Sequence, residues 1–459
     1  MRKVLFIRAV DATSEVESRY PGLGLAYLVS SLQSHFGDNY FEFKVIEKGN
    51  ESEVEKQISA FSPDIIGISS VTQNFNLAKK YASFARGKGI PVIMGGVHIS
   101  MLPWSLPEDA DMACIGEAES TIVEIFDLFV RGKGFPKEEL RKIRGIVFRD
   151  GNNNLALTEP RPLIKKMDDI KMPARDLLEI DKHSYIFSSR GCPFRCTFCA
   201  SSRFWDKVRL FSAEYVVREI KELYEKYNVR MVSFYDDLFI ISSRRLADIT
   251  ALLKKEGLHK KIKFTCSCRS NLVNEKIAII LKDMGVVSVG MGLESGSQRV
   301  LSYLKGESTS VEKNKNAIRV LKKHGIAVNA SLVIGSPDET ESEMMETYNF
   351  IKTSSLDLVD VYVLIPLPGT PVWQYAKERR LVSDDMDWSR LNINFEKGYG
   401  NAIILSEIYD REKLYKVYKR FRRLRLYMNL KNIWHSPFLT DLPKYIIKTF
   451  FGKIFSYIK

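Results

Sequence analysis

The sequence has few cysteines and no long apolar run. Only six of its 459 residues are cysteines, and three of these fall within eight positions, so a framework of disulfides is not expected. No stretch approaches the roughly 20 apolar residues that a membrane-spanning helix needs. The first residues, Met1 to Ile7, lack the apolar core and the cleavage site of a secretory signal. These absences exclude a disulfide-stapled secreted protein and predict a cytoplasmic chain.

The length and the charge of the chain limit the number of domains and the kinds of partner that can be expected. At 459 residues the chain is long enough for two domains and an appendage. The net charge is +13, but residues 401–459 carry thirteen Lys and Arg against four Asp and Glu, which is +9 of that total. The basic character is therefore local, and nucleic acid is disfavoured as a partner of the whole chain.

Strand-like apolar runs alternate with amphipathic helical patterns from residue 3 to about residue 130. Helices are expected to begin near Gly22, Glu51, Asn74 and Ser120. The expected strands are residues 3–9, 43–46, 65–69, 91–94 and 112–115. This alternation predicts a Rossmann-like domain with a mostly parallel sheet over residues 1–130. Ligands of such sheets bind at the carboxyl ends of the strands.

A second α/β region follows a connector. Residues 131–180 are rich in turn-forming residues, with a short hairpin around residues 150–154, and are predicted to be a linker. The alternation resumes with expected strands at residues 185–188, 231–235, 263–268, 288–292, 327–334 and 360–365. Six strands with intervening helices predict a partial, TIM-like (β/α)6 barrel over residues 181–385, with its chemistry at the carboxyl ends of the strands.

Residues 386–459 are predicted to form a basic helical extension. Residues 411–432 and 444–459 place apolar side chains at helical spacing, with Lys and Arg on the remaining surface. Such helices can pack against the barrel, contact an anionic membrane surface, or contact RNA. In the membrane interpretation the protein lies peripherally on the inner face of the membrane, and a lipid substrate becomes attractive.

Three cysteines stand close together at CxxxCxxC spacing: Cys192, Cys196 and Cys199. Thiolates at this density indicate an iron–sulfur cluster. The other cysteines are far away in sequence, so one iron of a four-iron cluster would stay open. A structural zinc site is disfavoured because zinc normally takes four protein ligands, and three buried core thiols are the remaining alternative.

This loop, with the aromatic Phe198 before its third cysteine, resembles the signature of the radical S-adenosylmethionine (radical SAM) superfamily. The resemblance implies a 4Fe-4S cluster whose open iron is chelated by the amino and carboxylate groups of S-adenosyl-L-methionine (SAM). An electron from the cluster then cleaves SAM to a 5′-deoxyadenosyl radical. A reducing partner such as flavodoxin or ferredoxin is also implied.

Four later segments resemble SAM-binding segments of that family, in the same order. When the aromatic residue of the cysteine loop is included, the implied SAM-binding residues are Phe198, Asp236, Asp237, Arg269, Glu294, Ser295 and Gly335. The two aspartates resemble a position near the SAM amino group, with helix capping as the alternative. Arg269 resembles an arginine near the SAM carboxylate. Glu294 resembles a carboxylate that binds the ribose or the amine, and Gly335 a glycine beside the adenine, with a plain turn as its alternative.

The first domain resembles the cobalamin (B12)-binding domain that precedes many radical SAM domains. The likeness is carried by the segments PGLGLAYL, PDIIGISSVT, GGVHIS and IGEAEST. The DxHxxG motif, whose histidine ligates cobalt in many B12 proteins, is absent. The resemblance therefore implies pocket residues and not axial ligands: Ser69, Thr72, Gly95, Gly96, His98, Gly116 and Glu117. A glycine pair lets a bulky ligand approach the backbone, whereas His98 equally fits a loop histidine that caps local backbone. A domain without corrinoid is the alternative.

Together these features predict a cobalamin-dependent radical SAM enzyme with a small-molecule or lipid substrate. The resemblance implies a methyltransferase that acts on an unactivated carbon through the 5′-deoxyadenosyl radical and methylcobalamin. One alternative is a ring-forming or ring-contracting enzyme related to the anaerobic cyclases, and another is a non-catalytic corrinoid or iron–sulfur sensor. Methylthiolation of tRNA is disfavoured because the first domain has no second cysteine trio.

Overall fold

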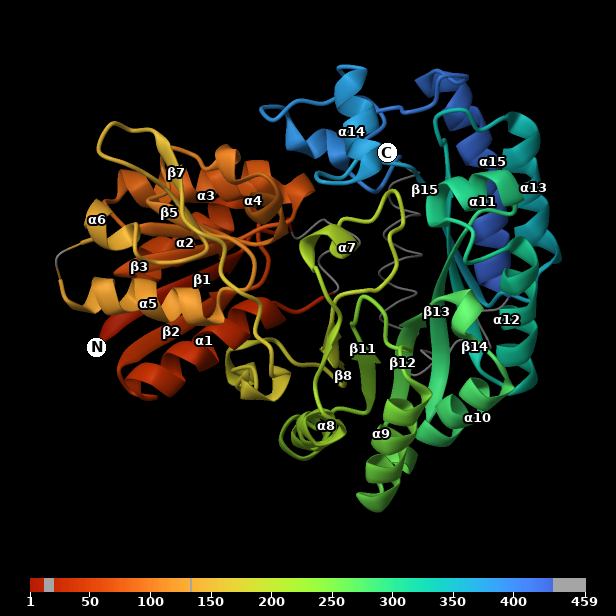
Figure 1. Ribbon diagram of the computed structural model, residues 1–459, viewed down its shortest axis with the longest axis horizontal. Coiled ribbons are helices and arrows are strands. Elements are labelled where there is room, and N and C mark those ends of the chain that lie inside the picture. The colour runs from red at the N-terminus through yellow and green to blue at the C-terminus, as the bar shows by residue number, and fades with distance from the viewer. Residues whose placement is uncertain (12–19, 133, 432–459) are drawn as a thin grey trace. The chain divides into compact units, whose positions relative to one another are not determined.

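The computed structural model describes residues 1–11, 20–132 and 134–431 (Figure 1). The chain divides into two units, and each is discontinuous in sequence. Unit 1 combines Met1–Val229 with Ile365–Ile403, and unit 2 combines Arg230–Leu364 with the described residues from Ile404 on. The segment that precedes the C-terminal helix thus belongs with the N-terminal half of the chain.

Unit 1 is built on a seven-stranded sheet with the strand order β2-β1-β3-β4-β5-β6-β7. The five parallel strands are β1 (Arg2–Arg8), β2 (Phe41–Ile46), β3 (Ile65–Ser69), β4 (Val92–Gly95) and β5 (Met112–Cys114). The expected parallel sheet is confirmed. Two antiparallel strands, β6 (Ile146–Arg149) and β7 (Leu155–Leu157), extend it as a hairpin. These residues fall in the stretch expected to be a linker, so part of that stretch belongs to the sheet.

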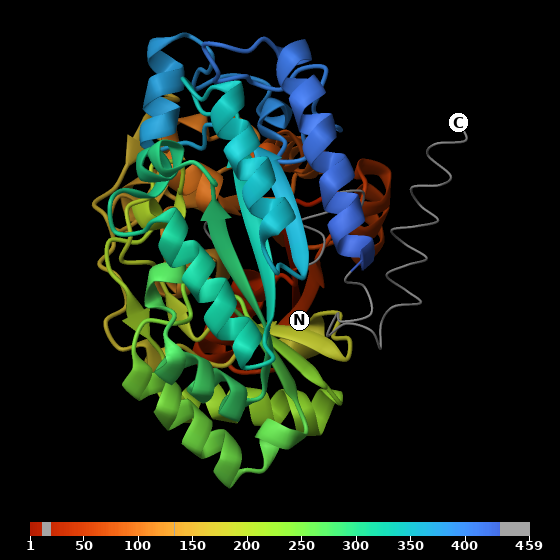
Figure 2. The ribbon, with the colours of Figure 1, turned by 90° about the vertical axis from the view of Figure 1, so that its right-hand side faces the viewer.

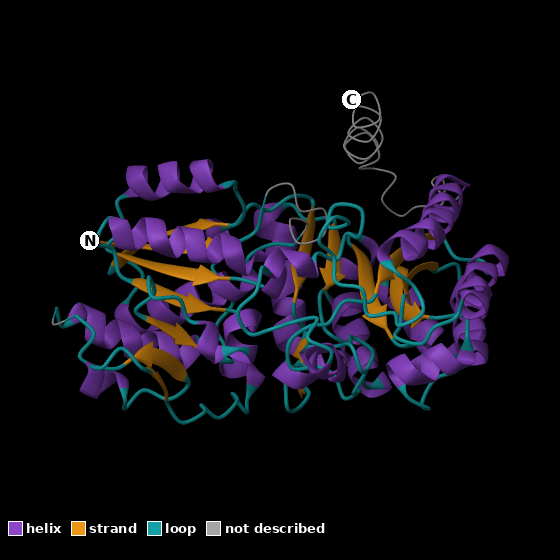
Figure 3. Cartoon of the chain, turned by 90° about the horizontal axis from the view of Figure 1, so that it is seen from above, coloured by secondary structure: helices purple, strands orange, loops and turns teal. Residues whose placement is uncertain are grey.

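Helices cover both faces of this sheet (Figure 3). They are α1 (Leu23–Phe36), α2 (Glu51–Phe61), α3 (Phe75–Gly87), α4 (Val97–Met101), α5 (Glu119–Val130) and α6 (Lys137–Leu140). The helix α1 contacts α5, and α2 contacts α3. Alternate residues of β1 point to opposite faces, and Val4 and Leu5 are both fully buried, as expected for a parallel strand covered on both sides. Asn50 and Glu53 form a capping box that starts α2 where the sequence predicted a helix.

The rest of unit 1 surrounds the cysteine loop. Its strands are β8 (His183–Ile186), β9 (Ser189–Arg190) and β10 (Arg209–Leu210), and its helices are α7 (Ser201–Phe204), α8 (Ala213–Tyr227) and α14 (Pro371–Glu378). β9 and β10 pair antiparallel. Short 3-10 turns, η4 (Met167–Asp169), η5 (Arg175–Leu177) and η8 (Trp388–Leu391), connect these elements.

Unit 2 contributes five parallel strands in the order β15-β14-β13-β12-β11. They are β11 (Met231–Phe234), β12 (Lys263–Cys268), β13 (Val286–Glu294), β14 (Ala327–Ile334) and β15 (Leu358–Val363). The intervening helices are α9 (Ser243–Lys255), α10 (Glu275–Met284), α11 (Gln298–Lys305), α12 (Val311–Lys323) and α13 (Glu341–Thr353). The predicted strand and helix alternation is confirmed, and these strands form an open sheet. The first expected strand of the barrel corresponds to β8, which belongs to unit 1.

The last described helix, α15 (Arg411–Lys431), lies beside β15 and α13 (Figure 2). Its buried face consists of Leu414, Val417, Tyr418, Phe421, Leu424 and Met428. Asn429 holds the edge of β15, because its Oδ1 accepts a hydrogen bond from Val359 N at 3.0 Å. Among the described residues, no helix is long and apolar enough to cross a membrane. The predicted apolar stripe therefore packs within unit 2, whereas the second expected basic helix lies outside the described residues.

Candidate cofactor-binding site

The three clustered cysteines lie on one loop of unit 1, directly after β9. Cys192, Cys196 and Cys199 are partly buried, and none forms a disulfide. The backbone N–H of Cys199 donates to the carbonyl of Cys196 at 3.3 Å, which makes the turn between them tight. No three ligating side chains already converge on a metal position within residues 1–11, 20–132 and 134–431. The donor set itself, three accessible thiols on one short loop, suits an iron–sulfur cluster.

Gly191 starts this loop in a conformation that only glycine adopts easily. Its φ is +95°, and a Cβ there would lie 2.7 Å from the carbonyl oxygen of Lys207. The far side of the loop is held by α14, because Val372 N donates to Thr197 O at 3.3 Å. Phe198, the predicted aromatic, is partly buried on the same loop. Backbone contacts thus fix the conformation of the loop at Gly191 and at Thr197.

A buried charge network lies at the base of the loop. Glu117 Oε1 accepts from Arg190 at 2.5 Å, and its Oε2 accepts from Arg209 at 2.6 Å and from Ile164 N at 2.8 Å. Burial acts to raise the pKa of Glu117, but the hydrogen bond from Arg209 and the charge of Arg190 outweigh it and hold the pKa below its ordinary value. Glu117, predicted as a cobalamin contact, therefore has both oxygens engaged by protein donors.

The other predicted cobalamin residues gather at the carboxyl ends of neighbouring strands. Ser69 ends β3 and pairs with Gly95, which ends β4. Gly96 follows with φ +96°, and a Cβ there would lie 2.5 Å from the carbonyl oxygen of Ser70. Gly116, after β5, donates its N–H to Ser100 Oγ at 3.0 Å. The structure thus brings Ser69, Gly95 and Gly96 together at the sheet edge, where ligands of parallel sheets bind.

Two more predicted cobalamin residues are buried. Thr72 lies in the 3-10 turn η2 (Thr72–Asn74). His98 is fully buried, with its ring centroid 3.8 Å from that of Phe75 and 4.5 Å from that of Trp388. Its Nε2 lies 3.2 Å from Ser105 Oγ. Burial, followed by the charge of Lys79, lowers the pKa of His98 to about 3, so the imidazole is neutral. His98 therefore packs in an aromatic cluster, and its partner Trp388 had no signal in the sequence.

In unit 2, two of the predicted SAM residues meet around Lys305. Glu294 ends β13 with φ +60°, and its Oε1 lies 3.3 Å from Lys305 Nζ. The same ammonium donates to the carbonyl oxygen of Gly292. Arg269 Nη2 donates to Lys305 O at 2.9 Å and to Ser308 Oγ at 2.7 Å. Lys305 was missed from the sequence, because nothing in the pattern of α11 marks its last lysine as buried.

Ser295 and Gly335 are held by neighbours that the sequence did not single out. Ser295 Oγ lies 3.0 Å from Thr347 Oγ1. Gly335, with φ +82°, follows β14, and its N–H donates to Glu339 Oε2 at 2.7 Å. Glu339 is fully buried, and this burial raises its pKa to about 7, although N–H groups of the turn act to lower it. The segment after β14 is therefore a turn built around one buried carboxyl.

The two aspartates after β11 that were predicted to bind SAM differ in their exposure to solvent. Asp236 is buried, whereas Asp237 is exposed. Neither caps a helix: α9 begins at Ser243, and its N-cap is Ser242, whose side chain accepts from Arg245 N. The helix-capping alternative for the pair is therefore wrong.

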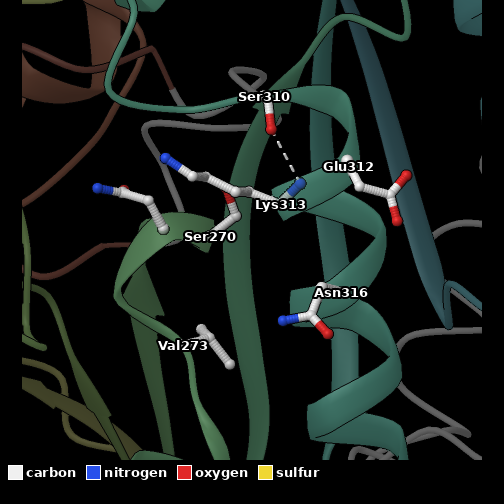
Figure 4. A pocket seen from close by; sticks show the side chains of 7 residues that line it. Ser270, Val273, Ser310, Glu312, Lys313 and Asn316 are labelled. Carbon is white, nitrogen blue, oxygen red and sulfur yellow. Dashed lines mark hydrogen bonds between the residues drawn. The ribbon is translucent and has the colours of Figure 1, made fainter.

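A surface pocket of about 320 Å³ lies at the start of α12 (Figure 4). One of its lining residues, Ser270, directly follows Arg269 in the sequence. It is lined by Ser270, Asn271, Val273, Ser310, Glu312, Lys313 and Asn316. The hydroxyl of Ser310 caps α12 by accepting from Lys313 N at 3.1 Å. None of the predicted cofactor residues lines this pocket.

Comparison with known proteins decides the family. The family model of the radical SAM superfamily matches residues 186–351, and that of the B12 binding domain matches residues 10–126. An uncharacterized methyltransferase of Pyrococcus horikoshii is 34% identical over 387 residues, which is 81% of each chain. The chain belongs to the radical SAM superfamily. Within it, the chain falls among the members that also carry a B12-binding domain, so the predicted family and enzyme class are confirmed.

Another relative and a solved structure also match most of the chain. The anaerobic magnesium-protoporphyrin IX monomethyl ester cyclase of Rubrivivax gelatinosus is 26% identical over 458 residues, 96% of this chain and 80% of the cyclase. The radical SAM methyltransferase TsrM from Kitasatospora setae, solved with cobalamin and a 4Fe-4S cluster, has a TM-score of 0.65 at 17% identity and covers 82% of this chain and 75% of its own.

The cobalamin-dependent SAM radical enzyme OxsB, solved with aqua-cobalamin and SAM, has a TM-score of 0.63 at 18% identity. It covers 92% of this chain and 62% of its own. These likenesses confirm the predicted fold, a B12-binding domain followed by a radical SAM domain. The three predicted cofactors are those bound in these structures of the same fold.

Proposed function

We propose that this protein is a cobalamin-dependent radical SAM methyltransferase that acts on an unactivated carbon. The observation that carries the proposal is the combination, in one chain, of a three-thiol loop and a B12-binding domain. The relative with 34% identity, named a methyltransferase, supports the reaction class. When bound, the cluster and SAM supply a radical that abstracts hydrogen, and the corrinoid supplies the methyl group.

The residues divide into three groups by the cofactor they would hold. Cys192, Cys196 and Cys199 would bind the iron–sulfur cluster. Ser69, Gly95 and Gly96 would form the floor for the corrinoid in a domain of residues 1–130. The predicted SAM contacts belong to a radical domain of residues 181–385, and there Glu294 and Arg269 are oriented by Lys305. Because Glu117 and His98 have other partners in the structure, we do not assign them to the corrinoid.

The chemistry explains why a fold of this kind is needed. An unactivated C–H bond has no acidic proton, so a positioned acid or base cannot break it. A radical must do so, and the protein must exclude water and competing hydrogen donors around it. An external one-electron reductant such as flavodoxin or ferredoxin and a small-molecule substrate follow from this chemistry.

The test is cofactor content after anaerobic purification from cells supplied with cobalamin. Iron, sulfide and corrinoid are quantified for the wild type and for a Cys192→Ala, Cys196→Ala, Cys199→Ala variant. A Cys266→Ala, Cys268→Ala variant is the matched control, because both thiols are buried on β12. Corrinoid in all three proteins, with the cluster missing only from the triple variant, supports the proposal. Cluster without corrinoid in the wild type contradicts a methyltransferase.

A ring-forming reaction is the second candidate, supported by the 26% identity to the anaerobic cyclase over nearly the whole chain. The products distinguish the two reactions. A methyl transfer that regenerates methylcobalamin from SAM yields S-adenosylhomocysteine together with 5′-deoxyadenosine, whereas cyclisation does not require S-adenosylhomocysteine. Quantifying both products in one turnover assay with a candidate acceptor therefore separates them.

Peripheral membrane contact, with a lipid substrate, depends on the part of the chain after α15. The apolar face of α15 already packs on β15 and α13. Flotation with anionic liposomes, comparing the full chain with a chain lacking residues 440–459, tests the remaining basic segment. Equal flotation of the two chains removes the support for a membrane-bound state.

A further inference from the structure

The loop that carries the three cysteines is closed at its base by a two-residue ladder. In this ladder β9 pairs antiparallel with β10, with Arg209 opposite Arg190 and Leu210 opposite Ser189. Residues 191–208 form the loop between the two strands. Two guanidinium groups thus stand opposite each other where the loop begins and ends. Like charges in directly opposed positions destabilise a strand pair, so the base of the loop requires a negative partner.

Glu117 is that partner, and it contacts both arginines. Its Oε1 lies 2.5 Å from Arg190 Nη1, and its Oε2 lies 2.6 Å from Arg209 Nη1. Only 3% of its side chain is exposed. Glu119, in α5, adds a second carboxylate that contacts Arg190 alone, at 2.5 Å. We call Glu117, Arg190 and Arg209 the clasp.

The backbone around the clasp is fixed by the same groups. Ile164 N donates to Glu117 Oε2 at 2.8 Å, and Ile164 O accepts from Arg209 Nη1 at 2.8 Å. The guanidinium groups of both clasp arginines lie over the ring of Trp205, with carbon-to-centroid distances of 5.8 Å for Arg190 and 5.3 Å for Arg209. Trp205 is itself in the loop, so the clasp contacts the loop at its two ends and at one interior residue.

We propose that Glu117 is a positioning residue for the iron–sulfur cluster, because it holds together the two ends of the loop that presents Cys192, Cys196 and Cys199. The inference rests on the proposed function, since it takes these thiols as cluster ligands. Glu117 follows β5 of the B12-binding domain. That domain therefore supports the cluster loop directly, in addition to any ligand it binds at its sheet edge.

The test compares Glu117→Gln with the matched control Glu124→Gln. The glutamine keeps the size and one acceptor oxygen but leaves the two buried guanidinium groups without their shared charge. Glu124, in α5, pairs with Arg161 at 2.6 Å, and its side chain is 44% exposed. Each protein is reconstituted anaerobically with iron and sulfide, and the rate at which a chelator removes iron is measured. We expect removal to be about tenfold faster for Glu117→Gln, as for outer-shell partners of metal ligands, and unchanged for Glu124→Gln.

Corrinoid content and far-UV circular dichroism of the iron-free proteins are measured in parallel, and both should match the wild type. Equal iron removal from Glu117→Gln and Glu124→Gln overturns the inference. So does a variant that keeps its cluster but loses corrinoid, since Glu117 would then contact the corrinoid. A wild type that takes up no cluster contradicts the proposed function, and is distinguishable because the control fails equally.

Arg209→Lys decides the matter if Glu117→Gln does not fold. Lysine keeps the positive charge, but its ammonium cannot replace the planar guanidinium that lies over the ring of Trp205. We expect iron removal from Arg209→Lys to be faster than from the wild type and from the Glu124→Gln control. A rate equal to that of the Glu124→Gln control contradicts the clasp.

Discussion

The ammonium group of Lys305 lies 3.3 Å from Oε1 of Glu294, and both side chains are more than nine-tenths buried. Lys305 ends α11, whereas Glu294 ends β13 in a left-handed conformation. The carboxylate at the end of this apolar strand therefore has a fixed cation beside it. A ligand that approached Glu294 would meet a carboxylate already oriented by Lys305.

Removing the cation should destabilise unit 2. In Lys305→Met the Glu294 carboxylate stays buried without its partner, which typically costs about 3–5 kcal/mol. Lys254→Met is the control, because Lys254 pairs with Asp283 on the surface, where such a pair contributes less than about 1 kcal/mol. Urea unfolding of both variants measures the difference. A Lys305→Met protein as stable as Lys254→Met would contradict the buried pair.

Gly96 should be intolerant of any side chain. Its φ of +96° disfavours other residues, and a Cβ would lie 2.5 Å from the carbonyl oxygen of Ser70. We expect Gly96→Ala to destabilise the protein by about 2–4 kcal/mol and to reduce corrinoid binding. A Cβ added at Gly24, in α1, would meet no atom within 4 Å outside the backbone of its own helix, so Gly24→Ala should be neutral or stabilising. Thermal unfolding and corrinoid content check both, and unchanged corrinoid content in Gly96→Ala would argue against a ligand at this edge.

Glu339 should make stability depend on pH. Burial raises its pKa to about 7 from the ordinary 4.5, so the folded protein binds this proton more tightly than the unfolded chain does. The contribution of the proton to stability is fully present below pH 4.5 and is lost as the pH rises to about 7. In Glu339→Gln the amide oxygen still accepts the N–H groups of Gly335 and Ser336 but does not titrate.

The stability of Glu339→Gln relative to the wild type should therefore rise by about 3 kcal/mol as the pH rises from about 4.5, the ordinary pKa, past about 7, the pKa in the folded protein. Urea unfolding at several pH values between about 4 and 8 measures this difference. Glu346→Gln, at an exposed position in the helix α13 that follows this turn, serves as the control and should show a flat difference. A flat profile for Glu339→Gln as well would show that the carboxyl is already ionised in the folded protein.

The apolar face of α15 should contribute to the stability of unit 2. Phe421 is fully buried, and its ring meets that of Tyr348 edge-on at a centroid distance of 5.6 Å. Phe421→Ala should cost about 3–5 kcal/mol, whereas Tyr427→Ala, at a side chain 59% exposed, should change stability by less than about 0.5 kcal/mol. Chemical denaturation of the two variants separates packing from surface exposure. Equal stability would reopen the membrane interpretation for this helix.

Local periodicity was sufficient to place most elements. The expected strands at residues 263–268 and 327–334 agree with β12 and β14 at both ends, and the helix expected at Glu51 begins there. Alternation of apolar residues with a period of two or of about 3.6 depends only on neighbours in sequence, so it is visible without the fold. The cysteine spacing and the segment likenesses were likewise local, and they were enough to indicate the family.

Partners separated along the chain could not be predicted in this way. Glu117 and Arg209 are 92 residues apart, and His98 meets Trp388 from a segment that follows the radical domain in sequence. The hairpin of β6 and β7 looked like a connector because its turn residues are a local signal, whereas its pairing with β5 is not.

The sequence by itself thus determined the elements, the thiol loop and the family. Only the tertiary structure decided that Glu117 contacts both arginines at the base of this loop, that His98 is a core residue and that Lys305 pairs with Glu294. The physical reason is that burial and charge pairing depend on which distant residues the fold brings together, and no local pattern records this.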